Sequence, residues 1–152
     1  SARAAGPVTA TAIAMEDMLL AAGDLDIRIV RGGTFYGPGT ARLPYWQALA
    51  SRGELVLPGD GGEYVSLLRV EDMASACVSL AEGDGLSGPW LVTDDEPVTW
   101  RGLFSQLCRL AGAAPPEAGG PALLPSVRAS NAALKAASGW SPAFPTFRSG
   151  LA

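Results

Sequence analysis

Histidine is absent from the sequence, and lysine occurs once, at Lys135, beside ten arginines. The absence of histidine removes the commonest general base and the commonest metal ligand of proteins, so we expect no metal site. Two cysteines are present, Cys77 and Cys108, and both fall at apolar positions of predicted helices. Buried free thiols are therefore favoured over a disulfide or a metal-binding pair.

The sequence also lacks the features that indicate a nucleic-acid or a membrane partner. The net charge is −4, and the arginines are spread along the chain without forming a basic stripe, which argues against nucleic acid as a partner. No apolar run approaches the roughly 20 residues that span a bilayer, and the N-terminal stretch SARAAGPVT lacks the apolar core of a signal peptide. We expect no membrane partner and, by default, a cytoplasmic location.

The composition is that of a globular protein of single-domain size, with 152 residues, 48% hydrophobic and 17% charged. Apolar periodicity predicts alternating helices and strands, an α/β pattern in which the later elements look like an appendage on a sheet. Expected helices cover 8–22 and 43–52, with others beginning at Asp72, at Thr99 and at Ser130; expected strands are 26–31, 54–57, 64–69 and 90–93, and the connector 113–125 holds one extended piece at 122–124.

A glycine-rich stretch at 83–88, GDGLSG, has the G-x-G-x-x-G spacing of a dinucleotide-binding loop. It follows a predicted helix and leads into a predicted strand, whereas a phosphate-binding loop leaves a strand and opens a helix. We therefore interpret this stretch as a plain connection.

A second glycine-rich stretch, RGGTFYGPG at 31–39, directly follows the predicted strand 26–31. Gly32, Gly33 and Thr34 are then expected at the carboxyl edge of the sheet, where open α/β sheets bind ligands and where small residues allow close approach to the backbone. A strand-to-helix turn that binds nothing is equally consistent with these residues.

Four blocks in a fixed order resemble the extended short-chain dehydrogenase/reductase superfamily, in its NAD-dependent epimerase/dehydratase branch, and the terminal block is most similar to atypical members. The resemblance implies the family's C-terminal half. Residues 1–42 would end a Rossmann-like doubly wound sheet, and 43–152 would mainly form the small substrate-side C-terminal subdomain with returning sheet elements. The blocks are RGGTFYGPG at 31–39, RVEDMA at 69–74, TDDEPVT at 93–99 and the segment 130–151, which contains GWSP.

The resemblance implies NAD or NADP as cofactor, bound through Gly32, Gly33, Thr34 and Tyr36. The family's glycine-rich nucleotide loop has no counterpart in this chain, so weak or no binding is expected from the chain alone. Packing within the turn is the alternative role for Tyr36.

Arg69 is the implied substrate-binding residue, with an ion pair to Glu71 or Asp72 as the alternative. Asp72 itself is expected to cap a helix. The substrate would be a small molecule. In sugar-nucleotide members of the family, residues that serve the diphosphate stand where this chain has Thr34 and Val65, which weakens a UDP-sugar or dTDP-sugar assignment.

The helix 8–22 would correspond to the helix that carries the family's catalytic Tyr and Lys, and the register places those positions at Val8 and Ala12. No Tyr or Lys occurs between residues 1 and 30, so no catalytic residue is predicted. Two interpretations stay open. The chain is either the C-terminal portion of an NAD(P)-dependent oxidoreductase or epimerase-like enzyme, or a non-catalytic, degenerate binding or interaction module.

The strand 26–31 would have a bare edge if the family's first strands are absent, because strands of a doubly wound sheet are normally paired on both sides. We therefore expect either an N-terminal polypeptide that completes the sheet or self-association through that edge. Arg31, at the end of this strand, is expected to be buried and paired with a carboxylate or with carbonyl groups of the turn.

Overall fold

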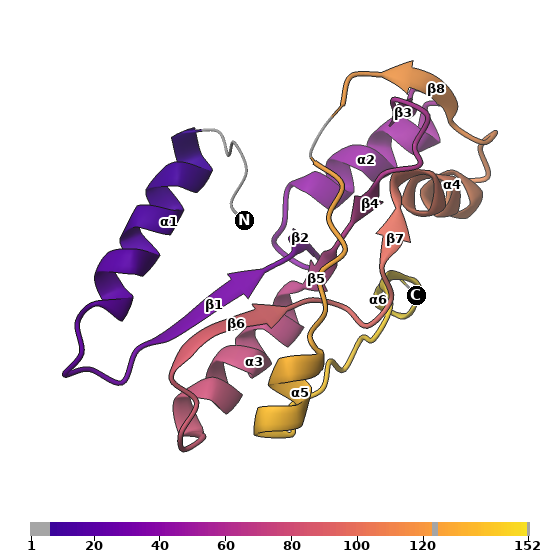
Figure 1. Cartoon of the computed structure of the whole chain (residues 1–152). Helices are drawn as coiled ribbons and strands as arrows, with labels where there is room; N and C mark the ends of the chain where they lie inside the picture. Colours follow the sequence, from indigo (N-terminus) through magenta and orange to yellow (C-terminus); the bar gives the residue numbers. More distant parts are fainter. Residues whose placement is uncertain (1–6, 123–124, 152) are drawn as a thin grey trace.

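The computed structural model describes residues 7–122 and 125–151, which form an α/β fold (Figure 1). In chain order the elements are α1 (Pro7–Leu20), β1 (Arg28–Gly32), β2 (Thr34–Tyr36), α2 (Arg42–Ser51), β3 (Val56–Pro58), β4 (Tyr64–Val65), β5 (Leu67–Arg69), α3 (Val70–Glu82), β6 (Gly88–Val92), β7 (Val98–Thr99), α4 (Trp100–Leu110), β8 (Glu117–Gly120), α5 (Ala132–Ser138) and α6 (Phe147–Gly150).

The strands pair two by two. β1 runs parallel to β6, β2 parallel to β5 and β3 parallel to β8, whereas β4 is antiparallel to β7. Figure 1 shows α1 on one side of the β1–β6 pair and α3 with α5 on the other. Residues 83–87 lie between α3 and β6, and Gly88 begins β6, which confirms that the stretch 83–88 connects a helix to a strand.

Two expected segments differ from the structure. The predicted strand 64–69 is divided at Ser66 into β4 and β5, because its two halves pair with different strands. In the connector, the strand is β8, earlier than 122–124, and residues 123–124 lie outside the described part of the chain. Gly120 permits this pairing, since a Cβ there would lie 3.0 Å from the Leu57 carbonyl oxygen.

The core consists of two apolar clusters that meet at β5. Leu67 belongs to one cluster and Leu68 to the other, because successive side chains of a strand point to opposite faces. The first cluster contains the edge-to-face aromatic group Trp46, Trp100 and Phe104. The second contains Val92, Leu134 and Trp140.

The structure confirms some of the predictions made for individual helix residues. Thr99 is the N-cap of α4, as predicted, and its side chain accepts a hydrogen bond from the Gly102 N–H. Cys108 is buried, but the expectation that Cys77 is buried was wrong. The buried face of α3 contains Ala76 and Leu80, and Cys77 lies about 100° around the helix from Ala76, toward solvent.

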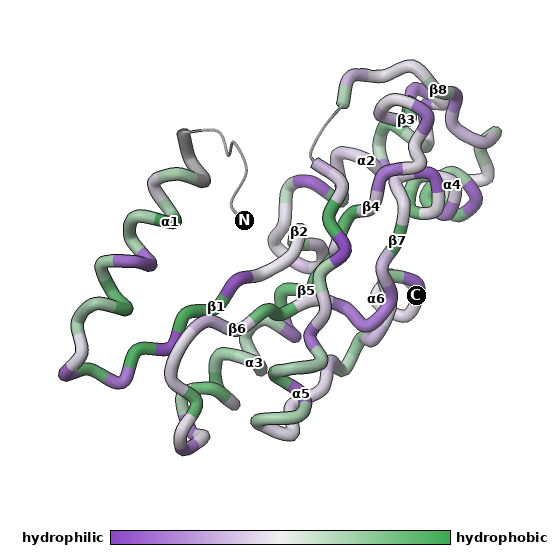
Figure 2. The backbone as a smooth tube through the Cα atoms, in the orientation of Figure 1, coloured by the Kyte–Doolittle hydropathy of each residue, from purple (hydrophilic) through white to green (hydrophobic). Residues whose placement is uncertain are grey.

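Helix α1 leaves most of its apolar side chains exposed. Met15, Met18, Leu19 and Leu20 are all exposed, and Figure 2 shows hydrophobic colouring along much of the helix. Helices that are apolar on several sides are normally buried. Among the described residues, no helix is both long and apolar enough to cross a membrane.

Arg31 of β1 forms an ion pair with Glu16 of α1, which confirms the expected carboxylate partner. Its side chain is 48% exposed, so the expectation that this pair would be buried was wrong. The bond from Arg31 lowers the pKa of Glu16 and raises that of Arg31 itself.

Asp72 has a structural role that differs from the expected helix cap. Helix α3 begins at Val70, and Arg69 occupies the N-cap position. Asp72 lies in the first turn with 1% of its surface exposed, and its carboxylate accepts hydrogen bonds from the N–H groups of Ala143 (2.7 Å) and Phe144 (3.0 Å). It therefore holds the C-terminal segment against the start of α3.

Asp94, which follows β6, is a second buried carboxylate, 4% exposed. Its Oδ2 accepts a hydrogen bond of 2.9 Å from the Tyr36 hydroxyl, while its Oδ1 has no hydrogen-bond partner among the described residues. Burial raises the pKa of Asp94 to about 6, and the charges of Asp72 and Asp95 add to this, against the opposing bonds from the Tyr36 hydroxyl and the Arg69 N–H.

The variant Asp72→Asn is expected to lower the free energy of unfolding by about 2–4 kcal/mol, because one of two buried N–H groups loses its acceptor. Urea denaturation followed by tryptophan fluorescence measures this. Asp84→Asn, in the exposed loop before β6, is the matched control and should change stability by less than about 0.5 kcal/mol. Equal effects of the two substitutions would contradict the role given to Asp72.

The Asp94→Asn variant should change the pH dependence of stability. Because the folded state raises the pKa of Asp94 from 3.8, its contribution to stability is full below pH 3.8 and is lost as pH rises through about 6. The variant lacks this loss, so its stability relative to the parent should rise by about 2 kcal/mol between pH 4.5 and 7. Parallel stability curves for the two proteins over that range would contradict the assignment.

Candidate functional site

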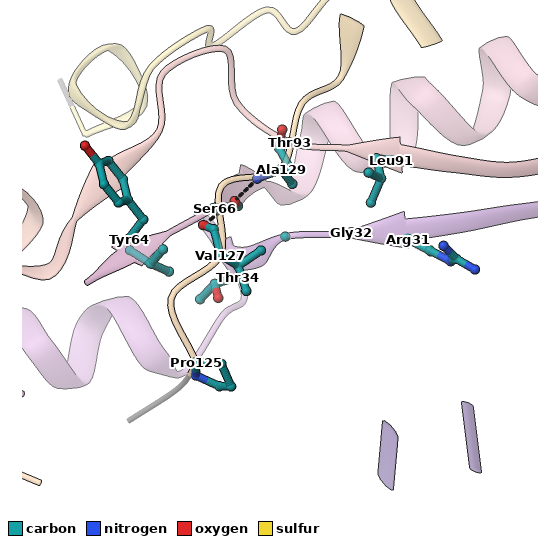
Figure 3. Close-up of a pocket in the computed structure, with 12 residues that line it drawn as sticks. Arg31, Gly32, Thr34, Tyr64, Ser66, Leu91, Thr93, Pro125, Val127 and Ala129 are labelled. Carbon is teal, nitrogen blue, oxygen red and sulfur yellow. Dashed lines mark hydrogen bonds between the residues drawn. The ribbon is translucent and has the colours of Figure 1, made fainter. Parts of the chain in front are cut away.

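A cavity of about 290 Å³ lies at the common end of β1 and β6 (Figure 3). These parallel strands are in register from Arg28 opposite Gly88 to Gly32 opposite Val92, so both chains leave the sheet at the same edge. That edge, at the carboxyl ends of parallel strands, is where open α/β sheets bind ligands. Gly32, Gly33 and Thr34 line the cavity at the position predicted from the sequence.

Gly33 allows two backbones to cross closely at the cavity wall. Its N–H donates to the Val92 carbonyl (3.1 Å), and the next N–H, of Thr34, donates to the Ser66 carbonyl (2.7 Å). A Cβ at position 33 would lie 2.5 Å from the Ser66 carbonyl oxygen, which no side chain tolerates. The glycine is therefore required by the neighbouring strand, and both N–H groups are already used.

A second wall comes from residues 125–129, for which no site role was predicted from the sequence. The Val127 N–H donates to the Tyr64 carbonyl (3.0 Å), so this segment runs beside β4. The Ser66 hydroxyl donates to the Val127 carbonyl (3.0 Å) and accepts from the Ala129 N–H (2.9 Å), as Figure 3 shows in part. The polar Ser66 within an otherwise apolar strand was the signal in the sequence for this attachment.

The cavity has few ionisable groups. Among its described lining residues, Arg31 is the one cation, and it pairs with Glu16. The Tyr64 ring lies 4.7 Å from the Arg128 guanidinium and points away from the other lining residues in Figure 3. No carboxylate, lysine or cysteine lines this cavity within the described chain.

Tyr36 and Arg69 lie away from this cavity. Tyr36 is in the core and bonded to Asp94, and burial raises the pKa of its hydroxyl, which therefore stays protonated. Arg69 donates to the Gly150 carbonyl, pairs with Glu71 and stacks 4.0 Å from the centre of the Phe144 ring.

The structure thus gives Tyr36 and Arg69 roles in holding the C-terminal residues. Binding of a cofactor by Gly32, Gly33, Thr34 or Tyr36, and of a substrate by Arg69, stays a prediction.

The positions expected for a catalytic pair are in α1. Ala12 is exposed, and the side chain of Val8 lies outside the described residues. Neither position carries an ionisable group, and within residues 7–122 and 125–151 no three His, Cys, Asp or Glu side chains are grouped so as to hold a metal ion.

The chain was compared with known proteins by sequence and by fold. No protein-family model matches the chain. The chain is 34% identical over 158 aligned positions to a 3-diazoavenalumate denitrifying reductase of a Streptomyces species, covering 94% of this chain and 52% of that protein.

Solved structures of similar fold extend the comparison. A Thermus thermophilus UDP-glucose 4-epimerase, in complex with NAD, matches with a TM-score of 0.75 and 26% identity, over 91% of this chain and 49% of the epimerase. A Bacillus anthracis dTDP-glucose 4,6-dehydratase, also in complex with NAD, matches with a TM-score of 0.78 and 22% identity, over 93% of this chain and 47% of the dehydratase.

The chain spans about half the length of the curated relative and of these enzymes. It has the fold of the extended short-chain dehydrogenase/reductases, in the NAD-dependent epimerase/dehydratase branch, and matches about half of a full-length epimerase or dehydratase.

Proposed function

We propose that this chain forms the substrate-side, C-terminal part of an NAD(P)-dependent reductase. The observation that carries the proposal is the cavity at the common end of β1 and β6, lined by Gly32, Gly33 and Thr34. Similarity to a curated reductase over 94% of the chain supports it.

The residues of this cavity fit one end of the cofactor. The nicotinamide ring, which supplies a hydride when the cofactor is bound, would lie beside Gly32 and Gly33 at the open side of the cavity, so that the cavity itself receives the substrate. The pyrophosphate is held elsewhere, because the one cation of the described lining, Arg31, pairs with Glu16 and the N–H groups of Gly33 and Thr34 are already bonded.

This chain would then contribute to the reaction by shaping the substrate site and by excluding water from it. No described lining residue points an ionisable proton donor toward the cavity, so these residues would donate no proton to the substrate. A substrate that accepts a hydride without a protein acid suits such a site, and any proton comes from solvent or from another polypeptide segment.

The rest of the enzyme would cover α1 and β1. Among the described residues β1 pairs with β6 alone, which leaves its second edge unpaired, and the apolar side chains of α1 are exposed beside it. We propose that an N-terminal polypeptide, corresponding to the half of the relatives that this chain does not match, binds this edge and helix. Without it, the same surfaces favour self-association.

A second candidate is a non-catalytic binding or interaction module. The absence of Tyr and Lys from residues 1–30, including Val8 and Ala12, favours it, because the family's proton-transfer pair then has no replacement in this chain.

Fluorescence titration with NADH and NADPH tests these functions. The chain alone should show no micromolar dissociation constant for either cofactor, because its cavity has no free group that would bind the pyrophosphate. The chain joined to the part of the Streptomyces reductase that it does not match should bind one of the two cofactors in the micromolar range. Micromolar binding by the chain alone contradicts the division of the site, and no binding by the joined protein contradicts the reductase proposal and favours the interaction module.

A further inference from the structure

We propose that the cavity at the end of β1 and β6 receives a planar aromatic ring of the substrate, in preference to a sugar ring. This inference rests on the proposed function in one respect, namely that this cavity is the substrate site.

The walls facing the cavity are mainly apolar and come from separate elements. Leu91 of β6 is 43% exposed and Val127 of the segment 125–129 is 48% exposed, although both line a concave site. Val65 and Pro125 continue the apolar lining. Exposed apolar side chains gathered around a cavity mark a surface that a ligand covers, because burying them is favourable by about 25 cal/mol for each Å² removed from water.

Hydrogen-bonding groups in the cavity are mostly engaged. The Ser66 hydroxyl donates to the Val127 carbonyl and accepts from the Ala129 N–H. The Gly33 and Thr34 N–H groups bond to neighbouring strands.

The Thr34 and Thr93 hydroxyls remain, and that of Thr93 is buried without a hydrogen-bond partner in the described chain. A sugar ring carries several hydroxyls, and most of them would lose water here without gaining a partner. An aromatic ring needs no such partners.

The charged groups near the cavity also favour an aromatic ligand over a sugar nucleotide. A sugar nucleotide brings a diphosphate, which needs cations. Arg31 pairs with Glu16, and Arg128 lies on the other face of its segment, since residues of an extended segment alternate. Val127 and Ala129 line this cavity, whereas Arg128 lines the neighbouring one and stacks on the Tyr64 ring.

The volume suits a single substituted ring. An apolar cavity of about 150 Å³ is enough to bind benzene, and this cavity of about 290 Å³ leaves room for substituents. A nicotinamide ring beside the substrate would enclose the open side.

The test compares two uncharged ring compounds of similar size, p-cresol and methyl β-glucoside, by NMR chemical-shift titration of the isotope-labelled chain. We expect saturable shifts from p-cresol at the amides of Thr34, Leu91 and Val127, and no saturable shifts from the glucoside over the same concentrations. Equal or tighter binding of the glucoside, or failure of p-cresol to bind, overturns the proposal.

Matched variants locate the binding. Val127→Asn puts a polar group on the cavity wall and should weaken p-cresol binding about tenfold or more. Val78→Asn on α3 replaces an equally exposed valine (54%) outside the cavity and should leave binding unchanged. Leu91→Asn, from the facing wall, is the second cavity variant, and unchanged binding in the folded Val127 or Leu91 variants overturns the proposal.

This experiment uses no cofactor, so its outcome is separate from that of the NADH titration. Binding of p-cresol together with failure of the joined protein to bind NADH or NADPH leaves an aromatic-binding site and rejects the reductase. The reverse pair of results keeps the reductase and rejects the aromatic substrate.

Discussion

The close crossing of two backbones at Gly33 determines how the parts of this molecule fit together. Gly33 passes within van der Waals reach of the Ser66 carbonyl, and any Cβ at this position would force the strands apart. The crossing connects the β1–β6 pair to the β2–β5 pair through bonds to Val92 and Ser66. Because β4 and β5 separate at Ser66 toward different partners, the cavity opens beside this point.

Two buried carboxylates then attach the C-terminal residues to this framework. Asp72 accepts N–H bonds from the segment before α6, and Asp94 accepts the Tyr36 hydroxyl against which Gly150 packs. Both acids are almost fully buried, and burial raises the pKa of Asp94 to about 6. Asp94 therefore acts on α6 through Tyr36, whereas Asp72 bonds directly to the backbone before it.

The sequence was sufficient to predict features that depend on local chemistry. The Thr99 cap, the helix 43–52 and the strand that leads to Gly32 all follow from residue patterns within a few positions, and the structure confirms them. The sequence was insufficient where contact with a backbone segment distant along the chain determines the structure. The EAGG segment becomes β8 because β3 lies beside it, and Asp72 faces Ala143, which is distant along the chain, rather than its own helix end.

Of the cavity, too, the sequence predicted the part that depends on local residues but not the part that depends on distant ones. Gly32, Gly33 and Thr34 were predicted from a strand followed by small residues, and they line the cavity. The wall formed by Val127 and Ala129 depends on hydrogen bonds to a segment about sixty residues after Ser66. The polar Ser66 indicates that a partner exists, but no local pattern identifies which segment supplies it.

We propose that α1 and the outer edge of β1 are surfaces for another polypeptide. An unpaired strand edge beside exposed methionine and leucine side chains is an association site in water. Sedimentation velocity of the purified chain over a wide concentration range measures this most directly. We expect species larger than the formula mass, or a companion polypeptide that sediments with the chain; a stable monomer at every concentration, without a companion, would contradict the association through α1 and β1.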